Sequence, residues 1–270
     1  MNKYIFKITI ICLLIFAPSY VFSQVIDLIW LEINNIDSTI YYSQHKNNRW
    51  SAKQSVSTGD DIKLTPAIAS SANKSIAAWV TSYHSVGLSL AYSIKPGKSW
   101  KTPQPIQFNF QETTGPALIA FNHQFFLFFA GNKNDDDDIY MSVLEKNRWS
   151  SPIMVHPDNS VPDLLPEPKI INGALTVVWQ HFDGDRYVYK SQEVIPTTNS
   201  QNKQKKRKLN FQETSPKKAA KKELQPNNTK ILKTKFNVTL PSDFKGVGLA
   251  KAYVQKDKKM PALYINLESN

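Results

Sequence analysis

Apolar residues before position 199 occur in short runs of about five residues, bounded by Gly, Pro, Asn or Asp. One series of four such runs occurs twice: PAIAS (66–70), SIAAWV (75–80), LSLAYS (88–93) and PQPIQF (103–108), then PALIAF (116–121), FFLFFA (125–130), DIYMSV (138–143) and SPIMV (151–155). These runs are too short for helices and have the length of buried strands. The pattern therefore predicts units of four short strands joined by hairpins.

The units recur about every 50 residues. Three features keep this period. They are a proline (Pro66, Pro116, Pro166), an aromatic residue 13 positions later (Trp79, Phe129, Trp179) and a tryptophan that closes a polar turn (Trp50, Trp100, Trp149). A fixed period of this size is typical of repeat proteins, and four strands per repeat form one propeller blade. We predict an all-β propeller of about four to five four-stranded blades over residues 24–198. We expect the turn tryptophans to pack between blades rather than to stack on a ligand.

The first 23 residues have the features of a secretory signal peptide. A short basic start precedes the apolar run ITIICLLIFA, and Ser23 precedes Gln24 at the expected cleavage point. No later stretch has the roughly 20 apolar residues of a transmembrane helix. The only cysteine, Cys12, lies inside this segment, so we expect an exported chain, periplasmic or secreted, without thiols.

The positive charge is concentrated in the last quarter of the chain. Residues 1–198 hold 16 Lys and Arg against 17 Asp and Glu, whereas residues 199–270 hold 17 against 5. The composition of 199–230 predicts a disordered Lys-rich linker. The alternating segments within 231–270 predict a small C-terminal β segment, which either completes the propeller or forms an appendage. A closed ring is our main expectation, and an open array completed by a partner is the alternative.

The repeated stretches LAYSIKPGKSWKTPQPI and IYMSVLEKNRWSSPIMV resemble the Asp-box (BNR) repeats of sialidase-like β-propellers, in degenerate form, over about residues 25–196. In that family an arginine cluster grips the substrate carboxylate, and a tyrosine, a glutamate and an aspartate perform catalysis. This chain has four arginines, at 49, 148, 186 and 207, and only Arg186 falls near the expected mouth. We therefore expect no sialidase activity and no enzyme.

The loops joining the second and third strands of each blade converge on one face of a propeller, where ligands bind. The residues of these loops that we expect to bind a ligand are Asn34, Asp37, Tyr83, His84, Asp135, Asp137, His181, Asp183, Asp185 and Arg186. No cofactor is required by this set. The run Asp135–Asp138 with Asp183 and Asp185 offers the oxygen ligands that Ca²⁺ prefers, and solvated acidic turns are the alternative.

Two clusters of basic residues interrupt the linker. They consist of Lys205, Lys206, Arg207 and Lys208, followed by Lys217, Lys218, Lys221 and Lys222. This spacing is typical either of a nuclear import signal, read by an import receptor, or of a segment that binds anionic polymers. Two functions follow. The first is an exported, monomeric, non-catalytic binding module for a carbohydrate or protein ligand. The alternative is a secreted bacterial effector that enters a host nucleus, and a divergent glycosidase comes third.

Overall fold

The computed structural model describes residues 25–34, 37–57, 59, 61–71, 74–83, 87–133, 136–195, 249–255 and 264–268. Within these ranges the chain forms strands and no helix. Accordingly, no helix in this part of the chain has the length and apolar character needed to cross a membrane. The predicted signal peptide (1–23) and Lys-rich linker (199–230) lie outside the described residues.

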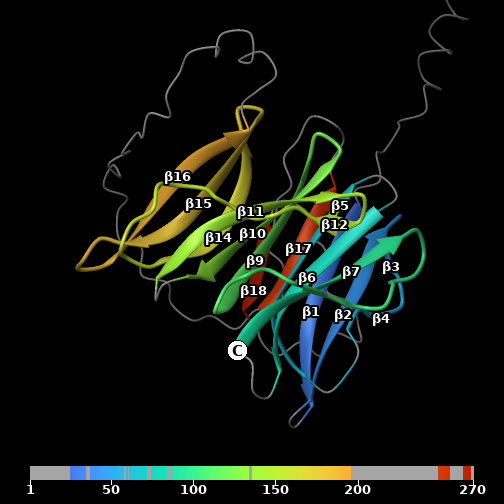
Figure 1. The fold of residues 1–270 in the computed structure, drawn as a ribbon. Helices are drawn as coiled ribbons and strands as arrows, with labels where there is room; N and C mark the ends of the chain where they lie inside the picture. The colour runs from blue at the N-terminus through green and yellow to red at the C-terminus, as the bar shows by residue number, and fades with distance from the viewer. Residues whose placement is uncertain are drawn as a thin grey trace, which may run out of the picture.

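The strands of the described residues form four antiparallel sheets, here called blades I to IV (Figure 1). Blade I contains β18 (Tyr264–Glu268), β17 (Leu249–Gln255), β1 (Val25–Asn34), β2 (Asp37–Lys46), β3 (Arg49–Trp50) and β4 (Gln54–Ser55). Blade II contains β5 (Ile62–Ser71), β6 (Lys74–Tyr83), β7 (Gly87–Pro96) and β8 (Gln104–Ile106).

Blade III is the sheet of the next unit, with β9 (Glu112–Phe121), β10 (Gln124–Asn132), β11 (Asp137–Glu145), β12 (Arg148–Trp149) and β13 (Ile153–Met154). Blade IV follows with β14 (Asp163–Ile171), β15 (Ala174–Phe182) and β16 (Tyr187–Ile195). The predicted outer strands 103–108 and 151–155 are shorter in the structure, as β8 and β13. Prolines at 103, 105 and 152 lack the N–H that a longer ladder would need.

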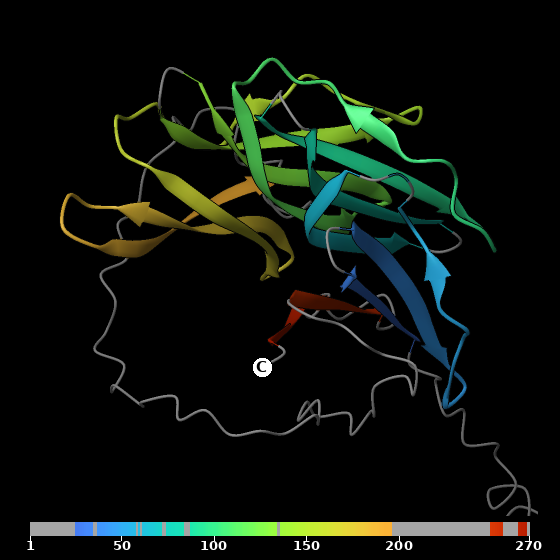
Figure 2. The same cartoon turned by 90° about the horizontal axis from the view of Figure 1, so that it is seen from below.

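The blades follow one another around a shared centre. The first strands of successive sheets are neighbours, because β5 contacts both β17 and β9, and β9 contacts β14. Figure 2 shows the sheets side by side around this centre. The all-β propeller class predicted from the 50-residue period is confirmed.

The far end of the chain contributes to the first blade. β17 pairs antiparallel with β1, from Val25 opposite Gln255 to Ile29 opposite Lys251. It thereby pairs with β1 as β5, β9 and β14 pair with the second strands of their own sheets, but β18 extends blade I beyond it, whereas β5, β9 and β14 end their sheets. The first unit of the sequence lacks a proline-led strand, and β17 stands where that strand would be.

A bulge precedes each repeated proline. The pairing of the first and second strands shifts register at this point in blades II, III and IV. The residues just before the prolines have positive φ, at 43° for Thr65, 57° for Gly115 and 53° for Leu165. A bulge of this kind leaves one residue unpaired, so a proline without an N–H costs no ladder hydrogen bond there.

The polar turn that ends in tryptophan is stabilised in the same way in three blades. In each blade a serine donates its hydroxyl hydrogen to the backbone carbonyl of the residue that follows the tryptophan. The three bonds are Ser43 to Ser51 at 2.7 Å, Ser93 to Lys101 at 2.6 Å and Ser142 to Ser150 at 2.7 Å. The repeated serine and the repeated turn therefore belong to one structural device.

Two of the turn tryptophans pack against the preceding blade, as expected. The ring of Trp100 lies edge-on to Tyr42 with centroids 5.2 Å apart, and Trp149 lies edge-on to Tyr92 at 5.8 Å. Trp50 lies against His45 of its own blade. All three are partly rather than fully buried, because their turns lie at the outer edge of the sheets.

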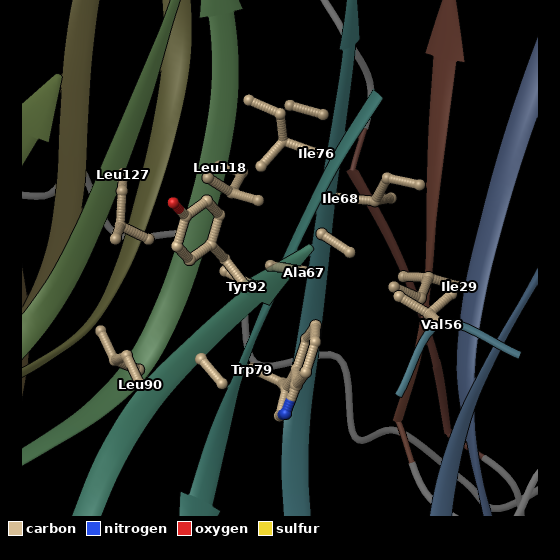
Figure 3. Close-up of a cluster of buried hydrophobic side chains, with 14 of the residues drawn as sticks. Ile29, Val56, Ala67, Ile68, Ile76, Trp79, Leu90, Tyr92, Leu118 and Leu127 are labelled. Atoms are coloured by element: carbon tan, nitrogen blue, oxygen red, sulfur yellow. The ribbon is translucent and has the colours of Figure 1, made fainter. Parts of the chain in front are cut away.

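The core lies between the faces of adjacent blades. One cluster joins blades I, II and III and includes Ile29, Ile68, Trp79, Leu118 and Leu127 (Figure 3). A second cluster joins blades III and IV. Trp79, Phe129 and Trp179 of the repeated aromatic series belong to these clusters, and all four members, Trp30 included, are at most 3% exposed.

Candidate functional site

The predicted ligand loops connect the second and third strands of each blade, and the structure describes only part of them. His84 and Asp135 lie outside the described residues. Asn34 ends β1, Asp37 begins β2 and Tyr83 ends β6, and only the backbone of these three is described. Of the predicted ligand residues, those of blades III and IV are therefore the ones whose side chains can be located, Asp135 excepted.

The loop of blade IV is a local turn. The Asp183 Oδ1 accepts hydrogen bonds from the backbone N–H groups of Asp185 (3.1 Å) and Arg186 (2.9 Å). These bonds, that of Arg186 first, lower the pKa of the Asp183 carboxyl. The side chain of Arg186 is 77% exposed and its Nε lies 3.9 Å from Asp183 Oδ2. These predicted ligand residues thus form a solvated turn, the alternative reading of the acidic loops.

Behind this turn lies a buried carboxylate that the loop tips do not include. Asp163, the first residue of β14, is fully buried. Its Oδ1 accepts the indole N–H of Trp179 at 2.6 Å and lies 2.8 Å from His181 Nδ1, and its Oδ2 accepts from Asn159 Nδ2 at 2.8 Å. His181, which was predicted as a ligand residue, makes this contact with Asp163 from the neighbouring strand β15.

His156 lies between this carboxylate and blade III. Its Nδ1 is 2.9 Å from the carbonyl oxygen of Pro157, which can only accept, so Nδ1 carries the proton. Its Nε2 accepts the backbone N–H of Ile139 at 3.2 Å and lies 3.3 Å from Asp163 Oδ2 and 3.8 Å from Asp138 Oδ1. The ring stacks on Trp179 with centroids 5.1 Å apart. A single imidazole nitrogen therefore faces two carboxylates.

Asp138, the second residue of β11, completes this buried cluster of Asp138, His156 and Asp163. The residue is 2% exposed, and its Oδ1 has no hydrogen-bond partner. Burial raises the pKa of Asp138 to about 6, an effect that His156 opposes. Its neighbour Asp137 is partly buried, and burial raises the pKa of that carboxyl too.

The sequence contained a signal for this cluster. Lys63, Thr113 and Asp163 lie 50 residues apart, each three positions before a repeated proline, and all three are buried. Comparing these equivalent positions would have singled out Asp163 and Lys63 as charged residues at a core position of the repeat. The ligand candidates predicted from the sequence were loop residues instead, because exposed polar residues in loops are usually the ones that bind.

A separate hollow lies where the connection from blade II reaches blade III. A cavity of about 350 Å³ is lined by the 107–110 connection, by Lys133 of the blade III loop, by Tyr140 and by 149–152. Its walls contain four aromatic residues: Phe108, Phe110, Tyr140 and Trp149. Polar groups stand beside them on Gln107, Asn109 and Lys133. Sequence reasoning did not find the aromatic wall, since Phe108 belongs to a run that was expected to form an outer strand.

The aromatic wall is held by contacts with the core. Phe110 meets Tyr140 with centroids 4.6 Å apart, and Phe108 stacks on Phe129 at 5.0 Å. Phe110 also lies so close to Gly131 that a Cβ at this position would approach its ring to 2.9 Å. The rings are therefore fixed in place before any ligand arrives.

Comparisons with known proteins found a likeness in structure but none in sequence. No protein-family model matches the chain, and no curated protein matches it in sequence. Solved structures that resemble it include sialidases, an α-L-arabinofuranosidase and an α-L-arabinanase, all at low identity.

Two of these structures represent the set. The K499G mutant of NanB sialidase from Streptococcus pneumoniae matches with a TM-score of 0.45 and 12% identity over 62% of this chain and 29% of its own. The α-L-arabinofuranosidase from Lactobacillus brevis matches with a TM-score of 0.42 and 14% identity over 58% of this chain and 62% of its own. The chain thus spans under a third of the first and less than two thirds of the second. Likeness at this level says nothing about substrate or activity.

Proposed function

We propose that the protein is a propeller-type binding module that holds a carbohydrate in the aromatic cavity of blade III. The observation that carries this proposal is the cavity wall, where four aromatic rings stand beside amide and ammonium groups. Sugar rings present apolar C–H faces and hydroxyl groups together, and such a wall offers a partner for each. Its volume of about 350 Å³ lies within the range of small-molecule pockets, which begins near ~300 Å³.

The preorganised wall supports binding further. Because Phe108 and Phe110 are already packed on Phe129 and Tyr140, a ligand would not need to order them. Rigid aromatic groups lower the entropy cost of binding. Lys133 and Asn109 are exposed at the rim, where they can donate hydrogen bonds to ligand hydroxyls.

We infer that the module is not a sialidase. Arg49 and Arg148 are exposed in equivalent outer turns, and Arg186 is exposed beside Asp183. These three described arginines therefore do not converge on one carboxylate. We also interpret the serine-turn-tryptophan units as degenerate Asp-box repeats, in which the serine bond and the tryptophan contact are kept and the turn aspartate is lost. A fluorogenic sialoside assay at several pH values tests this inference, and sustained turnover above a mock-purified control would contradict it.

An oligosaccharide array of animal and plant-wall glycans, followed by calorimetry on the best binder, tests the binding proposal. We expect Asn109→Ala and Lys133→Ala each to weaken binding about 5- to 10-fold, the value of a lost hydrogen bond of roughly 1 to 1.5 kcal/mol. Lys98→Ala, an exposed lysine that does not line the cavity, should have no effect. Binding that is insensitive to both cavity variants, or the absence of any glycan binder, would refute the proposal.

A second function rests on the charge of residues 199–270. We propose that the clusters Lys205–Lys208 and Lys217–Lys222 attract anionic polymers or an import receptor, which would suit an exported effector that reaches a host nucleus. The net charge of these residues, 17 basic against 5 acidic, supports this proposal. A glycan ligand in the cavity and a basic address in the tail are compatible in one chain.

A further inference from the structure

We propose that Asp138, His156 and Asp163 form a binding site for one divalent transition-metal ion between blades III and IV. One potential ligand atom from each residue lies within 4.8 Å of the others. Ligand atoms about 2.0 to 2.2 Å from a common ion are separated by distances of this order or slightly less. The three residues come from β11, from the connection after β13 and from the start of β14, so two blades would share the ion.

The unsatisfied carboxylate oxygen is the observation that points to a ligand. Asp138 Oδ1 is buried without a hydrogen-bond partner and faces His156 Nε2 at 3.8 Å. A buried polar atom in this state costs free energy unless something pairs with it. Among the described side chains, no lysine or arginine forms a salt bridge with Asp138 or Asp163. A cation in the centre of the cluster would satisfy both carboxylates.

The surrounding contacts orient the ligand atoms as an outer shell does in metal sites. The bond from His156 Nδ1 to the Pro157 carbonyl leaves Nε2 as the acceptor nitrogen, which lies 3.3 Å from Asp163 Oδ2 and 3.8 Å from Asp138 Oδ1. Trp179 and His181 hold Asp163 through Oδ1, which leaves Oδ2 turned toward His156. Asn159 Nδ2 also donates to Asp163 Oδ2 at 2.8 Å, and this oxygen has a second lone pair for the ion.

One existing hydrogen bond would be exchanged. Ile139 N–H donates to His156 Nε2 at 3.2 Å, whereas the equivalent strand N–H of Ile40 in blade I donates to Ser57 Oγ at 2.8 Å. A serine is therefore enough to accept this strand N–H, and no histidine is needed for that purpose. The bond in blade III is the longer of the two and therefore the weaker one. The imidazole supplies a nitrogen ligand that the serine of blade I does not.

The ligand chemistry selects the class of metal. One imidazole nitrogen with two carboxylate oxygens suits Zn²⁺ and neighbouring first-row ions, while Ca²⁺ prefers oxygen ligands alone. Of the sequence-based candidates for calcium, Asp135 to Asp138 with Asp183 and Asp185, this site includes Asp138 alone.

Calorimetry and thermal unfolding of the chelator-treated full chain, with Zn²⁺, Mn²⁺ and Ca²⁺ added separately, test the proposal. We expect one Zn²⁺ per chain, and a melting temperature raised by roughly 5 to 10 °C when Zn²⁺ is about 100-fold above its dissociation constant. Asp138→Asn should weaken Zn²⁺ binding at least 10-fold. His156→Gln should do the same, while His123→Gln, a change at an exposed histidine, should leave it unchanged.

Three results would overturn the site. They are no Zn²⁺ binding by a folded wild-type chain, unchanged Zn²⁺ binding by Asp138→Asn, and stabilisation by Ca²⁺ alone. The first of these, together with a higher melting temperature of Asp138→Asn without metal, would show that a shared proton rather than an ion joins the carboxylates. None of these results depends on whether blade III binds a glycan.

Discussion

Replacing Trp100 with alanine tests whether the turn tryptophans hold neighbouring blades together. The indole of Trp100 lies edge-on to Tyr42 across the boundary between blades I and II, with centroids 5.2 Å apart at 78°. It also packs against the core cluster of blades I to III, but it is only partly buried. The side chain therefore links two repeats from the outer edge rather than from the centre.

The expected loss follows from this position. Truncating a fully buried tryptophan to alanine costs about 3 to 5 kcal/mol. Partial burial reduces this value, and an edge-to-face aromatic pair contributes about 0.5 to 1.5 kcal/mol beyond the buried area. We expect Trp100→Ala to lower the free energy of unfolding by roughly 2 to 3 kcal/mol, measured by urea denaturation followed by circular dichroism.

A double-mutant cycle separates the contact between blades from simple loss of volume. Tyr42→Leu and Trp100→Ala should together cost less than the sum of the single changes, by about 0.5 to 1.5 kcal/mol. Strict additivity, or a loss below about 0.5 kcal/mol for Trp100→Ala, would mean that the tryptophan does not couple the blades.

Three further predictions concern the bulge, the buried carboxylate and the tail. Gly115→Ala should cost about 1 kcal/mol in urea unfolding, since its φ of 57° disfavours a Cβ; an unchanged midpoint would contradict the strain. Trp179→Phe should cost about 1 to 3 kcal/mol because buried Asp163 loses a donor. A phenyl ring already occupies the equivalent position as Phe129, so a loss near zero would show that the bond contributes nothing. A large fluorescent reporter fused to residues 199–230 should enter a eukaryotic nucleus, and the same fusion with residues 205–208 replaced by alanine should stay in the cytoplasm. Cytoplasmic retention of the intact fusion would contradict the import hypothesis.

The period of the sequence was sufficient to predict the fold class. Each recurring residue has one structural role per blade. The proline follows the bulge and the aromatic residue is buried in the core, while the serine bonds the turn and the tryptophan lies in that turn at the edge of the sheet. Such tasks depend on local contacts, and they therefore leave a trace at fixed spacing. The pairing of β17 with β1 joins segments more than 200 residues apart, and no periodic feature marked which C-terminal segment would supply the strand.

The candidate site was less predictable for a physical reason. Asp138, His156 and Asp163 come together only through the packing of blades III and IV. Asp138 lay in the acidic run 135–138 that the sequence offered as calcium ligands, whereas His156 and Asp163 lay outside the predicted loops. The rim residues chosen from the sequence are polar because they are solvated, as the turn around Asp183 shows. The aromatic cavity was missed for the opposite reason, because apolar residues in a connection look like core until their surroundings are known.

The equivalent positions 63, 113 and 163 show how one place in the repeat can serve different purposes. In blade II, Lys63 is 1% exposed, and its ammonium group is satisfied by the carbonyls of Gly59 and Asp61 at 2.8 and 2.7 Å and by the Asp61 carboxylate. Blade III has the small Thr113, and blade IV has Asp163 with its indole and imidazole donors. A buried charge persists only where its partners are complete. Lys63 meets this condition within its own blade, whereas the carboxylates around His156 draw on two blades and still leave one oxygen of Asp138 unpaired. By this reasoning the charge at position 63 of blade II has no need of a ligand. The unpaired oxygen at the boundary between blades III and IV supports the cation site that we propose there.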